Sequence, residues 1–161
     1  MLIRNAEQTD IPSLLAIYNH AIEHTTATFD LKKQTIEQRK KWFSKYGDRY
    51  PLLVAEDDGK ITGYSCLSAY RDKPAYQWTC ELSVYVDPDS QGKGIGKWLM
   101  EAVLEKAKTL GYHSVISGIT AGNQASIKLH EQFHFEFIGS FREVGYKFEN
   151  WQDVWFYQLM L

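Results

Sequence analysis

The sequence predicts a single α/β domain in which a central mixed sheet has helices on both faces. Three observations lead to this prediction. The chain has 161 residues, a length typical of one domain. Segments with helical apolar spacing and short strand-like runs are both present, and they follow one another along the chain. No repeat, charge block or Gly/Ser/Pro-rich linker divides the sequence, so the predicted domain spans residues 1–161.

Two helix starts stand out in the N-terminal third. Pro12 suits the first turn of a helix, because proline lacks the N–H that a first turn leaves unpaired. Thr35, followed three residues later by Gln38, forms the pattern of a capping box. The elements predicted in this third are a strand at 2–4, a helix that begins after Thr9 or Asp10, an irregular loop at 24–29, and a helix from Thr35 to about Gly47.

From residue 52 onward the pattern changes mainly to strands. The turn sequence at 57–60, Asp-Asp-Gly-Lys, separates two apolar runs and predicts a β-hairpin. Gly111 stands where a glycine that ends a helix belongs. The predicted elements are strands 52–56, 61–69 and 77–86, helix 94–110, strand 114–119, helix 124–133, and strands 135–142 and 154–161.

Composition and charge exclude several classes of protein. With 18 Lys+Arg against 20 Asp+Glu, the net charge is −2, so no basic field attracts nucleic acid or a membrane surface. No apolar run approaches the roughly 20 residues of a membrane span, and the N-terminus has no signal-peptide pattern, so we expect a cytoplasmic protein. Cys66 and Cys80 are too few for a disulfide framework or a four-cysteine zinc site. We also expect no metal, because no ligand spacing joins His20, His24, His113 and His134.

A glycine-rich turn lies between a predicted strand and a predicted helix. Gly92, Gly94 and Gly96 would leave several backbone N–H groups open at the positive end of the helix dipole, which predicts an anion site. Lys97 excludes a dinucleotide fingerprint because it occupies the third glycine position. Trp98 excludes a Walker A loop because Ser or Thr is required there. The alternative is a tight turn that only uses glycine.

The segment Gln91-Gly92-Lys93-Gly94-Ile95-Gly96 resembles the Arg/Gln-x-x-Gly-x-Gly/Ala motif of the GNAT superfamily of N-acetyltransferases. The predicted order of strands and helices is also similar to that family over essentially the whole chain. Further matches resemble the phosphinothricin or methionine sulfoximine N-acetyltransferase branch. They comprise Asn19–Glu23 with Thr25–Phe29, Trp78–Glu81 with Ser83–Val86, Asn123 with Leu129–Glu131, and Gly145–Lys147 with Trp151 and Asp153.

This resemblance implies the GNAT fold and acetyl-coenzyme A as acetyl donor. The glycine turn would hold the pyrophosphate, and the end of the preceding strand would meet the pantetheine arm. Asn123 would hydrogen-bond the pantetheine, although its place before a helix equally suits a simple N-cap. The implied cofactor-binding residues are Val84, Tyr85, Val86, Gly92, Lys93, Gly94, Ile95, Gly96, Lys97 and Asn123.

Glu81 is the candidate general base, because amide formation needs a neutral amine and a carboxylate can accept the proton directly or through water. Strand alternation alone would favour a surface carboxylate; the resemblance favours catalysis. The amine would attack directly in a ternary complex with no acyl-enzyme, and Cys66 and Cys80 would be structural. His130 occupies the position of the family's general acid for the leaving thiolate, and a histidine packed beside the cofactor is an equal alternative.

The resemblance implies a small amino-acid-like amine as substrate. Arg71, Lys73 and Tyr76 lie in the loop before the Glu81 strand, where positive charge would oppose a polyamine. The alternatives are another amine, such as a protein N-terminus or a polyamine, and a non-catalytic acyl-coenzyme A sensor. A homodimer through the aromatic C-terminal strand is also open. The implied substrate-binding residues are Phe29, Arg71, Lys73, Tyr76, Tyr85 and Lys147.

Overall fold

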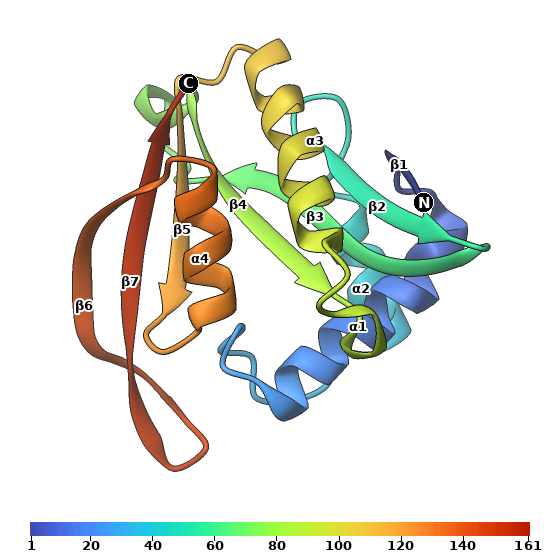
Figure 1. Cartoon of the computed structure of the whole chain (residues 1–161), viewed down its shortest axis with the longest axis horizontal. Helices are drawn as coiled ribbons and strands as arrows, with labels where there is room; N and C mark the ends of the chain where they lie inside the picture. The colour runs from blue at the N-terminus through green and yellow to red at the C-terminus, as the bar shows by residue number, and fades with distance from the viewer.

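The computed structural model describes residues 1–161 as a seven-stranded sheet in the order β1-β2-β3-β4-β5-β7-β6 (Figure 1). Only the β4–β5 pair is parallel. The strands are β1 (Leu2–Asn5), β2 (Leu52–Asp57), β3 (Lys60–Ala69), β4 (Thr79–Val86), β5 (Ser114–Thr120), β6 (Glu136–Lys147) and β7 (Asn150–Met160), and the helices are α1 (Ile11–His24), α2 (Ile36–Phe43), α3 (Ile95–Thr109) and α4 (Gln124–Gln132).

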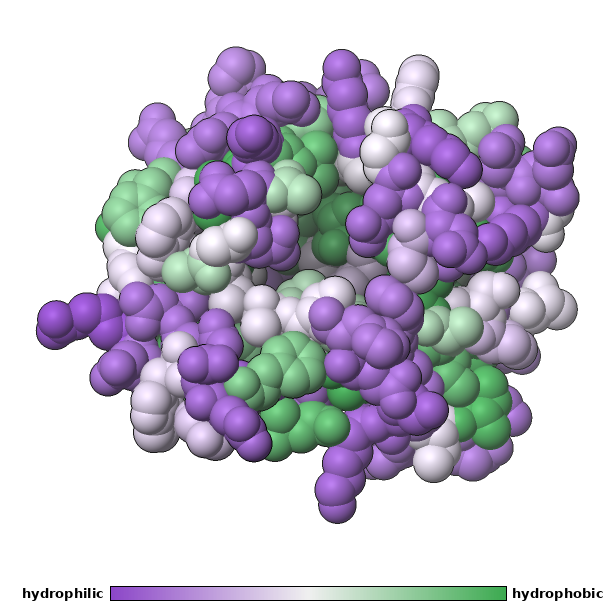
Figure 2. Space-filling model, turned by 60° about the horizontal axis from the view of Figure 1, so that its bottom comes forward, coloured by the Kyte–Doolittle hydropathy of each residue, from purple (hydrophilic) through white to green (hydrophobic).

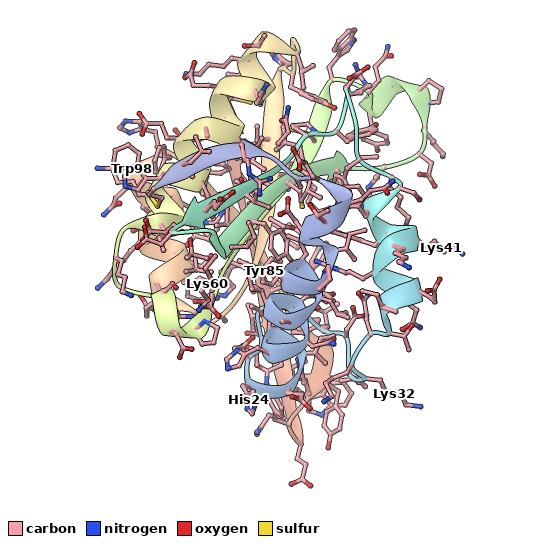
Figure 3. The ribbon with its side chains drawn as sticks, turned by 90° about the vertical axis from the view of Figure 1, so that its right-hand side faces the viewer. His24, Lys32, Lys41, Lys60, Tyr85 and Trp98 are labelled. Carbon is pink, nitrogen blue, oxygen red and sulfur yellow. The ribbon has the colours of Figure 1, made fainter.

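The helices cover the two faces of the sheet, as the sequence predicts. Figure 3 shows the sheet edge-on, with α3 on one side and α1 and α2 on the other. Successive side chains of β3 point to opposite faces of the sheet and therefore pack in different cores. Ser65 donates a hydrogen bond to the Leu99 carbonyl of α3, whereas Tyr64 packs with Trp42 of α2. On β4, Leu82 belongs to the α3 core, and Tyr85 contacts Tyr18 of α1. The two faces of β4 therefore serve different layers.

β4 and β5 pair along only part of their length. The parallel register joins Thr79 to Ser114, Cys80 to Val115 and Glu81 to Ile116, and it ends there. The strands then diverge toward the lower edge of Figure 1, where an open wedge replaces the ladder. Since the backbone groups beyond Glu81 have no strand partner on that side, the wedge is a place where an extended ligand can complete the sheet.

The last two strands are longer than predicted. The sequence predicts strands at 135–142 and 154–161, whereas β6 and β7 form one long hairpin whose tip is at Phe148 and Glu149. Both tip residues have positive φ, 54° and 60°, a conformation that a two-residue hairpin turn requires and that glycine or asparagine usually supplies. Because neither residue is present at the tip, the sequence lacks the usual turn signal.

Smaller differences concern element ends. The helix that begins at Thr35 has the predicted capping box but ends at Phe43, several residues before Gly47. β4 begins at Thr79 rather than residue 77, because a short 3-10 helix occupies Pro74–Tyr76. Gly111 adopts φ +80° directly after α3, as a terminating glycine should. No helix is both long and apolar enough to cross a membrane.

Candidate active site

The wedge between β4 and β5 opens into a cleft of about 1140 Å³. Figure 2 shows the hollow with pale and green atoms at its floor and mostly purple atoms around its rim. Its volume exceeds the roughly 300–1,000 Å³ of an ordinary small-molecule pocket, so it suits a long ligand. The lining comes from α1 and the loop after it, from β4 and β5, from the glycine turn, and from α4.

The glycine turn forms one end of the cleft. Gly92 and Gly94 have φ values of +75° and +79°, which L side chains rarely adopt. Gly94 is the N-cap of α3, so the first N–H groups of that helix point out of its N-terminus. A Cβ on Gly96 would lie 3.3 Å from the Leu129 side chain of α4. These features provide open N–H donors and a positive dipole end without side chains in the way, which suits a pyrophosphate.

The backbone of β4 faces the cleft at alternate residues. The Leu82 carbonyl lies 3.3 Å from the Ser117 hydroxyl of β5, whereas the Asp87 N–H donates to the Thr62 carbonyl of β3. Since successive strand residues direct their N–H and C=O groups to opposite neighbours, Val84 and Val86 present theirs to the cleft. The Tyr85 backbone faces β3. Val84 and Val86 can therefore pair with an extended arm, and Tyr85 can contribute only its side chain.

Glu81 lies at the fork of the wedge, as the last residue of β4 that pairs with β5. No side chain hydrogen-bonds or ion-pairs with its carboxylate. Burial raises the pKa of this carboxyl, and the positive charge of Arg71 partly opposes the increase. A free carboxylate whose pKa is raised by burial is a better proton acceptor than a surface glutamate, which favours the predicted role as base.

Neither cysteine thiol is suited to act as a nucleophile in the cleft. Cys66 and Cys80 are free and buried, and burial raises their pKa values to about 11 and about 12. Cys80 packs in the α3 core, on the opposite face of β4 from Glu81. Protonated thiols are poor nucleophiles. These observations favour direct transfer without an acyl-enzyme.

His130 lines the cleft but is 4% exposed, and both of its ring nitrogens have partners. Nδ1 donates to the Ser126 carbonyl at 2.7 Å, and Nε2 lies 2.9 Å from the Ser117 hydroxyl. Burial lowers the pKa of the imidazole, and the bond to Ser126 partly opposes the decrease. A neutral ring with its proton on Nδ1 leaves Nε2 as an acceptor toward Ser117. This geometry favours a histidine that orients Ser117 over an imidazolium acid.

Some of the other predicted site residues line the cleft, and the rest lie outside it. Asn123 caps α4 by accepting from the Ser126 N–H at 3.3 Å, and it also lines the cleft, so the two interpretations are compatible. Among the predicted substrate residues, only Tyr85 lines the cleft. Arg71 stands near enough to Glu81 for the two charges to interact, while Lys73 and Tyr76 are exposed on the same loop. Lys147 is buried and donates to the Thr28 carbonyl at 2.8 Å.

The position of Phe29 depends on a long-range contact with Gly145 of β6. A Cβ on Gly145 would lie 2.4 Å from its ring, so the ring packs directly on the β6 backbone. Sequence reasoning missed Ser117 and Lys128, which line the cleft. In the strap (residues 25–30) it assigned a binding role only to Phe29, whereas Thr25, Thr26 and Ala27 line the cleft. For Ser117 the sequence gives no clear signal, because β5 also contains the hydroxyl residues Ser114 and Thr120.

Comparison with known proteins identifies the class that this fold and cleft define. The family model described as an acetyltransferase (GNAT) domain matches residues 3–156. The chain therefore belongs to the GNAT acetyltransferase family, and it is an acetyltransferase by this membership.

The chain is also similar to particular acetyltransferases. The chain is 40% identical to the L-methionine sulfoximine/L-methionine sulfone acetyltransferase of Pseudomonas aeruginosa, over 99% of this chain and 94% of the relative. It is 37% identical to the phosphinothricin N-acetyltransferase of Streptomyces coelicolor, over 97% and 94% of the two chains. A phosphinothricin acetyltransferase from Sinorhizobium meliloti, solved in complex with acetyl-CoA, superposes with a TM-score of 0.94 at 32% identity, covering 99% of this chain and 88% of that one.

Proposed function

We propose that the protein transfers the acetyl group of acetyl-CoA to the amine of a small amino-acid-like substrate of the phosphinothricin or methionine sulfoximine type. The observation that supports this most is the wedge itself. The open N–H groups at the start of α3 follow one end of the unpaired edge of β4, and Glu81, which does not itself line the cleft, lies at the other end with a free carboxylate. The names of the relatives support the choice of substrate class.

The residues fit the donor from end to end. Gly92, Gly94 and the N-terminus of α3 would hold the pyrophosphate, with Lys93 and Lys97 adding positive charge nearby and Ile95 and Gly96 offering N–H groups in the first turn. Val84 and Val86 would pair with the pantetheine arm, and Asn123 would face it from the start of α4. When bound, acetyl-CoA supplies an activated thioester acyl group.

Glu81 would deprotonate the amine. An alkyl amine of pKa about 10 is roughly 99.9% protonated at pH 7, and forming its neutral state costs about 4 kcal/mol. Glu81 can accept that proton directly or through water, since its carboxylate has no internal partner. The Val84 N–H, directed into the cleft, would stabilise negative charge on the reacting carbonyl oxygen. His130 would fix the Ser117 hydroxyl by accepting its hydrogen bond at Nε2, and so would hold that hydroxyl at the end of the wedge.

The substrate would approach from the α1 face of the sheet, where the Glu81 and Tyr85 side chains point. Arg71 lies close to Glu81 and is exposed, so it can bind an anionic group that the substrate carries beside its amine. Lys73 and Tyr76, on the same loop, add a cation and a hydroxyl. Positive charge at this position disfavours a polycation such as spermidine.

An amine panel tests this proposal. We expect purified protein with acetyl-CoA to acetylate phosphinothricin and methionine sulfoximine far faster than spermidine or a peptide with a free N-terminus. Arg71→Gln should raise the KM for phosphinothricin about tenfold, because the variant removes the positive charge that would strengthen the hydrogen bond to the anionic group of the substrate. It should leave the KM for acetyl-CoA unchanged.

Two results would contradict the substrate class. One is acetylation of spermidine or of the peptide in preference to the amino acids. The other is tight acetyl-CoA binding with no turnover on any amine, which would indicate a sensor.

We propose further that the enzyme is a homodimer that associates through the β6–β7 hairpin. This hairpin projects from the rest of the sheet (Figure 1) and has an unusual share of exposed large apolar side chains. A concentration of exposed large apolar side chains on one element is typical of a protein–protein contact. The side chains concerned are Phe137, Ile138, Phe141, Val144, Tyr146, Phe148 and Trp151, each at least 50% exposed.

Sedimentation analysis of the wild type should give twice the mass of one chain, and Trp151→Glu should shift the equilibrium to monomer. Trp98→Glu is the matched control, since Trp98 is also about half exposed but lies on α3. A monomeric wild type would refute the dimer.

The proposal also includes a single acetyltransferase domain and a cytoplasmic location. The two unpaired thiols support the location.

A further inference from the structure

The strap, residues 25–30 after α1, is attached to the sheet at three consecutive carbonyls. The Thr120 hydroxyl of β5 donates to Thr26 at 2.7 Å, the Tyr85 hydroxyl of β4 to Ala27 at 3.4 Å, and the Lys147 ammonium of β6 to Thr28 at 2.8 Å. These donors come from three strands, two of which diverge at the cleft. The strap therefore spans the wedge, held by side chains rather than by a ladder of its own.

A buried lysine such as Lys147 is an unusual residue for such an attachment. Its side chain is 3% exposed and has no carboxylate within ion-pair distance. Burial lowers the pKa of the ammonium, and the charge of Asp30 partly opposes the decrease. Burying a cation without a paired acid is unfavourable, and an apolar side chain would fill the same space without that cost. The contacts that offset this cost are the hydrogen bond to the Thr28 carbonyl and the Phe148 ring, whose centroid lies 5.0 Å from the ammonium.

The strap also packs tightly against β6. Phe29 lies on the bare backbone of Gly145, where any Cβ would overlap its ring. At the other end, the Thr25 N–H still bonds to Ala21 of α1. The strap is consequently fixed at both ends and along its middle, and its position relative to the cleft is well defined.

The inner surface of the strap is part of the cleft. Thr25, Thr26 and Ala27 line it beside His20 and His24. Tyr85 bonds to the strap from the same face of β4 as Glu81, opposite the α3 face. The strap thus borders the side from which the amine would approach, away from the glycine turn.

We propose that Thr120 and Lys147 are positioning residues that hold the strap as the wall of the amine site, and so control amine affinity without touching the amine. This proposal rests on the proposed function for the identity of the amine side. If either bond is lost, the strap samples more conformations, and ordering it again on substrate binding is unfavourable. For Lys147 this role replaces the direct substrate contact that the sequence predicts.

Thr120→Val tests the proposal with little change in shape. We expect the KM for phosphinothricin to rise about fivefold, the effect of one ordinary hydrogen bond, with the KM for acetyl-CoA unchanged. Thr62→Val is the matched control. Thr62 is equally buried and donates to the Ala55 carbonyl at 3.1 Å, a bond in the β2–β3 part of the sheet. Its amine KM should not change.

Hydrogen–deuterium exchange provides a readout that needs no substrate. The amides of residues 27–30 should exchange faster in Thr120→Val and Lys147→Met than in wild type, and Lys147→Arg should restore much of the protection. Unchanged exchange in both variants would overturn the proposal. So would a rise in the KM for acetyl-CoA equal to that for the amine. If the wild type acetylates no amino-acid-like amine, the proposed function fails, while the exchange result still decides whether the strap is held by these side chains.

Discussion

Glu81→Gln is expected to lower turnover by roughly 10²–10⁴-fold while the affinity for acetyl-CoA stays within about twofold of wild type. The amide keeps the size of the side chain and cannot accept the ammonium proton. Because burial disfavours the Glu81 carboxylate, its neutral replacement should not destabilise the fold, and the unfolding temperature should not fall. Steady-state kinetics, calorimetry with acetyl-CoA and a thermal melt measure these three quantities.

The pH dependence of activity provides a second test of Glu81 as the general base. Glu81 acts as a base only when deprotonated, and its pKa lies above the ordinary glutamate value. Activity at a fixed concentration of neutral amine should therefore fall as pH decreases through that raised pKa. The Glu81→Gln variant should lack this acid limb. Glu105→Gln, an exposed glutamate on α3, is the control and should match wild type. Wild-type turnover in Glu81→Gln would remove this residue from the mechanism.

Gly94→Val is expected to weaken acetyl-CoA binding by about 100-fold or more. A side chain at φ +79° strains the backbone and shifts the N–H groups at the start of α3, which the pyrophosphate would need. Calorimetry with coenzyme A measures the affinity directly.

The control for Gly94→Val separates binding from folding. Gly59→Val introduces the same side chain at φ +75°, in the open turn between β2 and β3. We expect a similar loss of stability from both variants and a loss of affinity only from Gly94→Val. Intact coenzyme A affinity in Gly94→Val would show that the pyrophosphate binds elsewhere.

The main parts of the cleft follow from local patterns in the sequence. The glycine turn is recognisable because anion binding at a helix N-terminus needs small residues at defined positions. Two-residue alternation along β4 correctly separates Glu81 from Cys80 and Leu82. The sheet with helices on both faces is confirmed, since helical and extended apolar spacing differ clearly within each segment.

Other features depended on long-range contacts. The sequence groups Val84, Tyr85 and Val86 as one cofactor-binding run, whereas only the pairing of β3 with β4 shows that Tyr85 directs its backbone away from the cleft. The sequence predicts two separate strands at 135–142 and 154–161 and misses the hairpin that joins them, because the turn at Phe148 and Glu149 is sustained by the pairing of the strands rather than by local preference.

Taken alone, the sequence determined the order of elements, the glycine turn before α3 and the face on which Glu81 lies, because each depends on residues close together in the chain. The tertiary structure decided where β4 and β5 part, that His130 faces Ser117 with both nitrogens engaged, and that Lys147 reaches a carbonyl 119 positions away in the strap. The reason is physical. Periodicity and turn chemistry are local properties of the chain, whereas burial and hydrogen-bond partners depend on which distant segments the folded sheet brings into contact.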